Sequence, residues 1–256
     1  MTEHKNTPPQ IFQRFFNRWL DELDTQLQQL VSAANHHRDY DNSVNLRQLI
    51  DKSVRQYAEF YTMKSVAAKG DVISVFSPVW LTSLEDTFLW IAGWRPTTAI
   101  HLLYSKAGIQ FETKLEDLAP VFASSDLGDL SFNQISLVDK LHKKTIREER
   151  KITEKMAKLQ ESAADRPMVG LSNAVSDMMR NEDGDGGEES DRKVESTMEP
   201  KKDALEKLLN MADDLRMETL RGVIEILTPI QAVYFLIAAA ELHLRLHDWG
   251  LKKDAE

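Results

Sequence analysis

The sequence predicts an all-α fold, a single bundle of long amphipathic helices with an internal acidic loop. Apolar residues recur at three- and four-residue steps over most of the 256 residues, which places them on one face of a helix. The 10 glycines and 8 prolines are few for this length and argue against an all-β protein rich in turns. We find no internal repeat and no convincing strand. Residues 10–250 are expected to form one helical domain, between a disordered N-terminus (1–9) and a short tail (251–256).

Two long helical segments are expected in the first third of the chain. The polar residues 35–43 end the first helix, and a second helix follows over residues 44–61. Residues 63–76 are also expected to be helical, with Gly70 as a candidate interruption. Ser77-Pro78 then marks a stop, because the residue before a proline avoids the α region. The apolar stripe of the first helix consists of Ile11, Phe12, Phe15, Phe16, Trp19, Leu20, Leu23, Leu27, Leu30 and Val31.

Residues 79–92 are dense in large apolar groups and are expected to contain another helix. Thr82 or Ser83 is its candidate N-cap, with Glu85 near the third helical position. The sequence Gly93-Trp94-Arg95-Pro96 signals a turn. A further helix is expected to open at Thr97 or Thr98 and to end at Gly108.

The second half of the chain predicts three long helices and one break. The first runs over about 131–164. Residues 168–199 are expected to form a mobile internal loop, because the acidic, Gly-rich run NEDGDGGEESD has no apolar residue to offset its ordering entropy. Order is expected to return at Pro200, a candidate first-turn proline. The last helix is expected to begin with Thr228 as cap and Pro229 in the first position, and to end at Gly250.

Composition excludes several classes of protein. The absence of cysteine rules out a disulfide scaffold, an iron–sulfur cluster and a cysteine nucleophile. The net charge of −9 and the lack of a dense basic block argue against a free-standing duplex binder. The start of the chain has no apolar signal region, and the longest apolar stretch, 233–240, is too short to span a bilayer. We therefore expect an intracellular protein with no membrane association.

The segment ELHLRLHDWG carries the candidate cofactor and metal ligands. His243 and His247 are four residues apart, which places both imidazoles on one side of adjacent helical turns. Such a pair can chelate Zn²⁺ or Cu²⁺, or one of its members can supply an axial nitrogen to a haem iron. Both cannot ligate the same haem, because axial ligands lie on opposite faces of the macrocycle. The alternative is a pair of surface or interface histidines near a helix C-terminus, where positive charge is favoured.

Catalytic signatures are missing from the chain. It has no GxSxG, no phosphate-binding GxxxxGK, no GxGxxG and no HExxH. Most carboxylates lie on polar helix faces, and the aromatic cluster over residues 76–94 is best interpreted as core packing. We therefore expect a protein that is not an enzyme and that has no catalytic residue.

Several long motifs resemble one plant family. The stretch AAKGDVISVFSPVWLTSLEDTFLWIAGWRPTTAIHLLY (67–104) resembles the domain shared by delay-of-germination proteins and TGA-type bZIP transcription factors. The opening FQRFFNRWLDELDTQLQQL, the stretch EERKITEKMAKLQESAAD (148–165) and ADDLRMETLRGVIEILTPIQAVYFLIAAAELHLRLHDWG (212–250) are similar to other parts of that domain. The similarity covers about residues 10–250 apart from the acidic loop, and the ending ELHLRLHDWG looks more like the delay-of-germination branch.

The resemblance implies a regulatory protein of seed dormancy, abscisic-acid or stress signalling and transcription, located in nucleus and cytoplasm. Its implied partners are a type 2C protein phosphatase or a transcription factor, and self-association is a further expectation. The resemblance also implies haem held through C-terminal histidines, a pattern that His243 and His247 match. A haem-binding sensor is therefore one alternative function. Sequence-specific DNA binding, as in the TGA relatives, is another, although the domain starts at about residue 10 without their basic region.

Overall fold

A computed structural model describes residues 8–35, 43–107, 130–180 and 187–256, and within these ranges the regular structure is helical, without a strand. The predicted all-α fold is therefore confirmed. The elements in chain order are α1 (Pro8–Asn35), α2 (Ser43–Phe76), α3 (Ser83–Thr87), α4 (Thr97–Lys106), α5 (Phe132–Glu161), the 3₁₀ turn η2 (Ser162–Ala164), α6 (Arg166–Arg180), α7 (Gly187–Ile226) and α8 (Pro229–Asp254).

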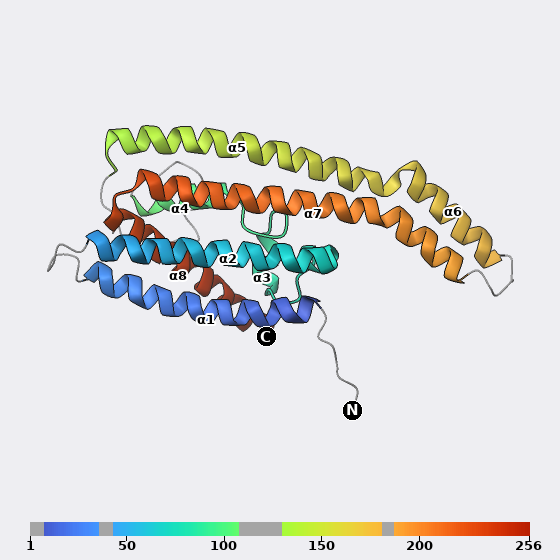
Figure 1. The fold of residues 1–256 in the computed structure, drawn as a ribbon, viewed down its shortest axis with the longest axis horizontal. Coiled ribbons are helices and arrows are strands. Elements are labelled where there is room, and N and C mark those ends of the chain that lie inside the picture. The colour runs from blue at the N-terminus through green and yellow to red at the C-terminus, as the bar shows by residue number, and fades with distance from the viewer. Residues whose placement is uncertain (1–7, 36–42, 108–129, 181–186) are drawn as a thin grey trace, which may run out of the picture.

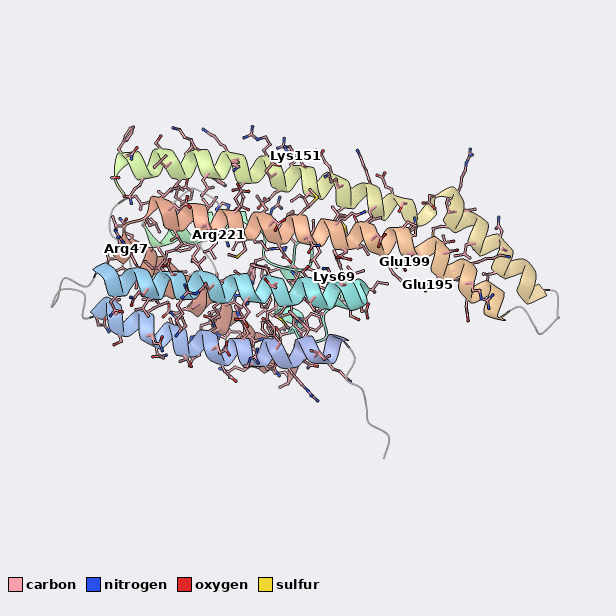
Figure 2. All side chains as sticks on the ribbon, in the orientation of Figure 1. Arg47, Lys69, Lys151, Glu195, Glu199 and Arg221 are labelled. Atoms are coloured by element: carbon pink, nitrogen blue, oxygen red, sulfur yellow. The ribbon has the colours of Figure 1, made fainter. Side chains whose placement is uncertain are left out.

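The helices lie in an elongated bundle (Figure 1). Helix α5 runs along α7, and α2 packs against α1, α7 and α8. Helix α6 continues beyond the end of α5 and lies beside the first part of α7, so these two segments extend beyond the end of the other helices (Figure 1). Charged side chains of both signs, including Lys151, Glu195 and Arg221, lie on the outside of the bundle (Figure 2).

The predicted stripe of α1 forms one half of the core. Phe12, Phe16 and Trp19 are at most 2% exposed, and they pack against residues of α2 and α8. A second part of the core surrounds Ile100 of α4 and Phe235 of α8, which are also buried. Each large apolar side chain that leaves water in this way contributes about 1.5–3 kcal/mol. The apolar faces therefore supply most of the force that holds α1, α2, α4 and α8 together.

Helix ends follow the predicted start signals. Thr228 caps α8 by accepting from the backbone N–H of Gln231, and Pro229 occupies the first turn. Thr82 caps α3 in the same way, with Glu85 completing a capping box. Helix α3 ends at Thr87, however, so residues 88–92 are a loop and not the continuation of a helix. This loop brings the aromatic residues that follow α3 close to α7.

Helix α2 continues through residues 63–76 and stops at Phe76, before Ser77-Pro78, as expected. Its interruption lies at Asp71, next to the predicted Gly70, where the backbone is extended. The Asp71 carboxylate accepts hydrogen bonds from the backbone N–H and the hydroxyl of Ser74. Asp71 thus caps the last turn of the helix in the manner of an N-cap residue.

The prediction of a mobile loop over 168–199 is wrong for residues 168–180 and 187–199, which lie in α6 and α7. Helix α6 has its own apolar face, which packs on α7, and Asp165 accepts from the backbone N–H of Met168 at its start. Lys201 of α7 donates to Asp165 at 2.8 Å and joins the two helices. Pro200 lies inside α7 and not in its first turn. Residues 181–186 of the acidic run lie outside the described residues.

Both predicted ends of the domain also need correction. Helix α1 already begins at Pro8, so the expected disorder is wrong for residues 8 and 9, while residues 1–7 lie outside the described ranges. Helix α8 passes through Gly250 and ends at Asp254, so most of the predicted tail is helical. The backbone N–H of Ser83 donates to Asp254 at 2.9 Å, which fixes this last turn to α3. Among the described helices, none is long and apolar enough to cross a membrane.

Candidate functional site

The two candidate histidines of α8 lie in different surroundings. The ring of His243 contacts the rings of Trp19 and Trp94, with centroid distances of 5.1 and 5.8 Å. The ring of His247 contacts Phe16 at 5.8 Å and lies beside Glu85 of α3. Helical spacing predicted that the two imidazoles lie on the same side of α8. Their neighbours differ, however, because aromatic rings surround His243 whereas a carboxylate lies beside His247.

His247 forms a half-buried ion pair. Its Nδ1 lies 2.9 Å from Oε2 of Glu85, an oxygen that also accepts from the backbone N–H and hydroxyl of Thr82. The hydrogen bond to Glu85 raises the pKa of His247, against the opposing effect of burial. Burial raises the pKa of Glu85, but the hydrogen bonds from His247 and Thr82 outweigh it and hold that pKa below its ordinary value. This pair joins α8 to the start of α3.

His243 is instead an uncharged imidazole. Burial lowers its pKa to about 4, against the raising effect of the Glu85 charge, and the nearby His247 lowers it further. No described residue forms a hydrogen bond with either ring nitrogen. A neutral imidazole offers one donor and one acceptor, so His243 has both available.

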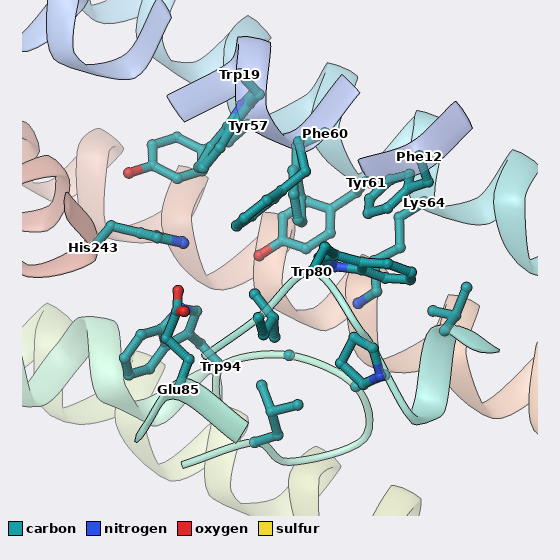
Figure 3. Close-up of a pocket in the computed structure, with 17 residues that line it drawn as sticks. Phe12, Trp19, Tyr57, Phe60, Tyr61, Lys64, Trp80, Glu85, Trp94 and His243 are labelled. Carbon is teal, nitrogen blue, oxygen red and sulfur yellow. The ribbon is translucent and has the colours of Figure 1, made fainter. Parts of the chain in front are cut away.

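His243 lines two adjoining cavities in the bundle, and Figure 3 shows the smaller of them. Their volumes are about 50 and 110 Å³, and both are bordered by Tyr57, Tyr61, Trp94 and His243. Burial raises the pKa of both tyrosines, so their hydroxyls stay protonated. Neither hydroxyl bonds to a described residue. The cavities therefore present polar groups from α2 and α8 within aromatic walls.

A buried charge cluster lies beside these cavities. Oδ1 of Asp213 lies 3.0 Å from Nζ of Lys64 and also accepts from the guanidinium of Arg216. Burial lowers the pKa of Lys64 to about 8, although Asp213 raises it. The other oxygen of Asp213 is buried without a partner among the described residues. All three side chains are at most 6% exposed, so each charge depends on the others.

Arg216 also organises the loop after α3. Its guanidinium donates to the carbonyls of Trp90, Ile91 and Trp94, the last at 2.6 Å. Ile91 and Ala92 have φ values of 49° and 52°, a left-handed conformation that costs energy in a β-branched residue. A Cβ at Gly93 would lie 2.8 Å from Cζ of Arg216. The hydrogen bonds from Arg216 thus hold a strained loop that forms one wall of the cavities.

Glu149 secures the other side of the same loop. Its side chain, 1% exposed, accepts from Nε of Arg95 and from the backbone N–H of Thr97, both at 2.7 Å. The second bond satisfies a free backbone donor at the start of α4. Helices α4, α5 and α7 are therefore joined through polar contacts around residues 90–97.

The described residues show no preformed metal site of three or more ligands around His243 and His247. No group of three or more histidine, aspartate or glutamate side chains in the described part of the chain can hold a metal ion. Nδ1 of His247 is bonded to Glu85, an arrangement that leaves its Nε2 available, and His243 has no hydrogen bond to a described residue. The cavities that His243 faces approach the size of one that holds benzene, so in this arrangement of side chains they are smaller than a porphyrin.

A second concave feature is an open groove of about 930 Å³ between α1 and α8. Asp21 and Asp24 line it from α1, while Asp248 and Asp254 line it from α8, and Arg245 and His247 provide its basic groups. Its apolar lining consists of Leu20, Leu27, Val31, Val79, Trp80, Leu81, Leu244 and Leu251. Val79 and Leu251 are 75% and 53% exposed, whereas Leu20, Leu27 and Trp80 are buried, so only part of this apolar lining is open to solvent.

Sequence analysis did not identify the Asp213 cluster, the cavities or the groove. Asp213 and Arg216 stand in the motif ADDLR, whose i and i+3 spacing places them on one helical face, but nothing in the sequence indicates their contact with Lys64. Glu85 was expected only as a capping residue, and it also pairs with His247.

Comparison with known proteins identifies a family. A family described as "DOG1: Seed dormancy control" matches residues 26–105. Protein DOG1-like 3 from Arabidopsis thaliana is 31% identical over 248 residues, covering 94% of this chain and 84% of that protein. Protein DOG1-like 4 from the same plant is 30% identical, covering 99% and 97%. Transcription factor TGA1 of Arabidopsis thaliana is 30% identical, covering 92% of this chain but 54% of the factor.

Proposed function

The chain belongs to the DOG1 seed dormancy control family, and on that premise we propose that it is a non-enzymatic regulator that acts by binding partner proteins. Its relationship to dormancy proteins and transcription factors suggests a role in seed dormancy and transcription regulation. Abscisic-acid signalling and a location in nucleus and cytoplasm are parts of this proposal. Transcription factors among the relatives support the nuclear location.

The observation that carries the proposal is the open groove between α1 and α8. Val79 and Leu251 are its exposed apolar residues, and Val31, Leu81 and Leu244 are partly exposed, so these side chains can contact an apolar helix face. Apolar surface that is open to solvent and bordered by charges marks sites of protein interaction. The groove is therefore the surface that we assign to the partner.

The charge around the groove defines the chemistry of the partner. Five carboxylates line it, against one arginine and one histidine, and Asp21 and Asp24 are exposed without an ion pair to a described residue. A partner helix with an apolar face and basic flanks would match both features. We propose that this helix belongs to a type 2C protein phosphatase or to a transcription factor. Self-association through the same groove would meet like charge and is the less favoured occupant.

Calorimetric titration tests this proposal with purified partners. The wild-type chain and the variant Asp21→Lys/Asp24→Lys are titrated with a type 2C protein phosphatase and, separately, with a TGA-type transcription factor. We expect the wild type to bind one of them, and the variant to bind about tenfold more weakly or less, which corresponds to about 1.4 kcal/mol. Leu251→Asp should weaken the same complex by removing an apolar contact.

The matched control is Asp51→Lys/Glu59→Lys, which makes the same change in charge on the exposed face of α2, outside the groove. This control should retain wild-type affinity. Equal affinity of the groove variant and the wild type would reject the groove as the docking site. Failure of both partner classes to bind the wild type would reject the proposed mode of action.

Haem sensing through His243 is the second candidate. Its support is the neutral imidazole without a hydrogen-bond partner among the described residues. A porphyrin is larger than the two cavities, so this proposal requires the surrounding side chains to move apart. Addition of haem should shift the Soret band in the wild type and in His247→Ala, but not in His243→Ala. An unchanged wild-type spectrum would reject it.

A further inference from the structure

We propose that the adjoining cavities beside His243 form a binding site for a small planar aromatic molecule with a hydrogen-bonding group. This inference is independent of the partner groove, which lies between α1 and α8. It rests on the size and lining of the cavities and on the polar groups that face them.

Aromatic side chains line both cavities. Trp19, Phe60 and Trp80 line the smaller one (Figure 3), Phe235 lines the larger one, and Tyr57, Tyr61 and Trp94 border both. Flat rings pack against such walls by stacked or edge-to-face contact. The arrangement therefore favours a planar ligand over a branched or extended one.

Three polar groups face this apolar space without a partner among the described residues. They are the hydroxyls of Tyr57 and Tyr61, one helical turn apart on α2, and the imidazole of His243 from α8. A few convergent polar groups in a mostly apolar cavity are the usual composition of a small-molecule site. The hydroxyls can donate to a ligand oxygen or nitrogen, and His243 can either donate or accept.

The charged groups beside the cavities are already hydrogen-bonded. Lys64 and Arg216 share one carboxylate, that of Asp213, and Arg216 also donates to backbone carbonyls of the loop. The other lining charges are Glu85, paired with His247, and Arg95, paired with Glu149. The two cations on Asp213 leave an excess of positive charge, so the site disfavours a cationic ligand.

Cavity size sets the limit on the ligand. A buried apolar cavity of roughly 150 Å³ is known to hold benzene. The larger cavity here measures about 110 Å³ and adjoins another of about 50 Å³. One ring, or two small fused rings, is therefore the occupant that these cavities fit in their present arrangement, and phenol and indole are suitable probes.

Thermal unfolding and calorimetry of the full chain test the site with phenol, indole and benzene. Phenol or indole should raise the melting temperature with increasing concentration, because a ligand that binds only the folded state stabilises it. Absence of binding by both phenol and indole would overturn the proposal.

Three variants locate the site. Tyr61→Phe and Tyr57→Phe each remove only a hydroxyl, and at least one of them should weaken phenol binding roughly three- to tenfold without changing benzene binding. Tyr234→Phe is the matched control, because Tyr234 does not line either cavity. Equal phenol affinity in all three variants would place the binding elsewhere and contradict the proposal.

Filling the space gives an independent test. Ala239 lines the larger cavity, so Ala239→Phe should abolish binding of phenol and indole. Circular dichroism checks that this variant is folded, and Ala239→Leu, which adds fewer atoms, replaces it if the phenylalanine prevents folding. A folded variant that still binds phenol with wild-type affinity would overturn the assignment of the cavity.

Discussion

The contact between Gly250 and Thr82 sets the distance between α8 and the start of α3. A Cβ at Gly250 would lie 2.0 Å from Oγ1 of Thr82, the atom that caps α3. The sequence predicted that Gly250 ends the last helix. In the structure α8 continues through Gly250, and the missing side chain lets Thr82 lie close to the helix backbone. A glycine near polar residues can mark either a helix end or a close contact between two elements, and only the tertiary structure distinguishes these two cases.

Substitution of this glycine tests the contact. Gly250→Ala should lower the free energy of unfolding by about 1–3 kcal/mol, because overpacking displaces Thr82 or α8. Urea unfolding measures the change. Gly170→Ala is the control, since no atom lies within 4 Å of the added Cβ, and it should stabilise α6 by about 0.5–1 kcal/mol. Equal effects at the two glycines would contradict the close approach.

The two histidines should give opposite pH dependences of stability. The pKa of His243 is about 4 in the folded chain and 6.5 when unfolded, so the unfolded state binds more protons between these values. Stability from this group should fall by up to about 1.4 kcal/mol per pH unit as the pH drops through that window. His243→Gln should remove this part of the slope in urea unfolding from pH 7 to pH 4.

His247 supplies the comparison. Its pKa is raised in the folded chain, so its contribution is complete below pH 6.5 and disappears as the pH rises through the folded value. The stability deficit of His247→Gln should therefore shrink with rising pH. If His243→Gln and His247→Gln showed pH dependences of the same sign, the assignment of their protonation states would be wrong.

At the scale of elements, Asp213 joins α7 to α2 and, through Arg216, to the loop after α3. Apolar periodicity predicted most of the helices because each has one face that must leave water. It could not predict which polar residues bridge them, since the partners of Asp213 and Glu149 come from positions far away in the sequence. Long-range ion pairs have no local pattern.

Removal of Asp213 should be strongly destabilising. Asp213→Ala leaves Lys64 and Arg216 buried without a carboxylate, for which we expect a loss of about 3–5 kcal/mol in chemical unfolding. The near-ultraviolet circular dichroism of the tryptophans should weaken as the loop loses Arg216. Asp214→Ala, an exposed neighbour, should change stability by less than about 0.5 kcal/mol. If Asp213→Ala changed the free energy of unfolding as little as Asp214→Ala, the cluster would not be important for stability.

Local composition led to a wrong prediction for the residues of α6 and the first part of α7. An acidic, Gly-rich run led us to expect a loop over 168–199, yet each flank is helical and α6 packs on α7. Amide hydrogen exchange should show slowed exchange in residues 168–176 of α6 relative to an unfolded chain. Exchange at the unfolded rate throughout this segment would support the loop and contradict the helix.

At the scale of the whole molecule, the sequence identifies the bundle and its family, but neither concave site. Residues of the groove come from α1, α8 and the segment before α3, and the cavities combine α1, α2, α8 and the loop after α3. Such sites depend on how the helices are arranged, which periodicity within one helix does not encode. His243 was found from its spacing with His247, but its neutral state follows from its surroundings.

The most direct test of the account is hydrogen exchange of the full chain, alone and saturated with its type 2C phosphatase or transcription factor partner. We expect slower exchange on binding in α1 around residues 17–31 and in α8 around residues 244–254, with α5 unchanged. Protection confined to α5 or to α6, with the α1 and α8 segments unaffected, would contradict the groove as the docking surface.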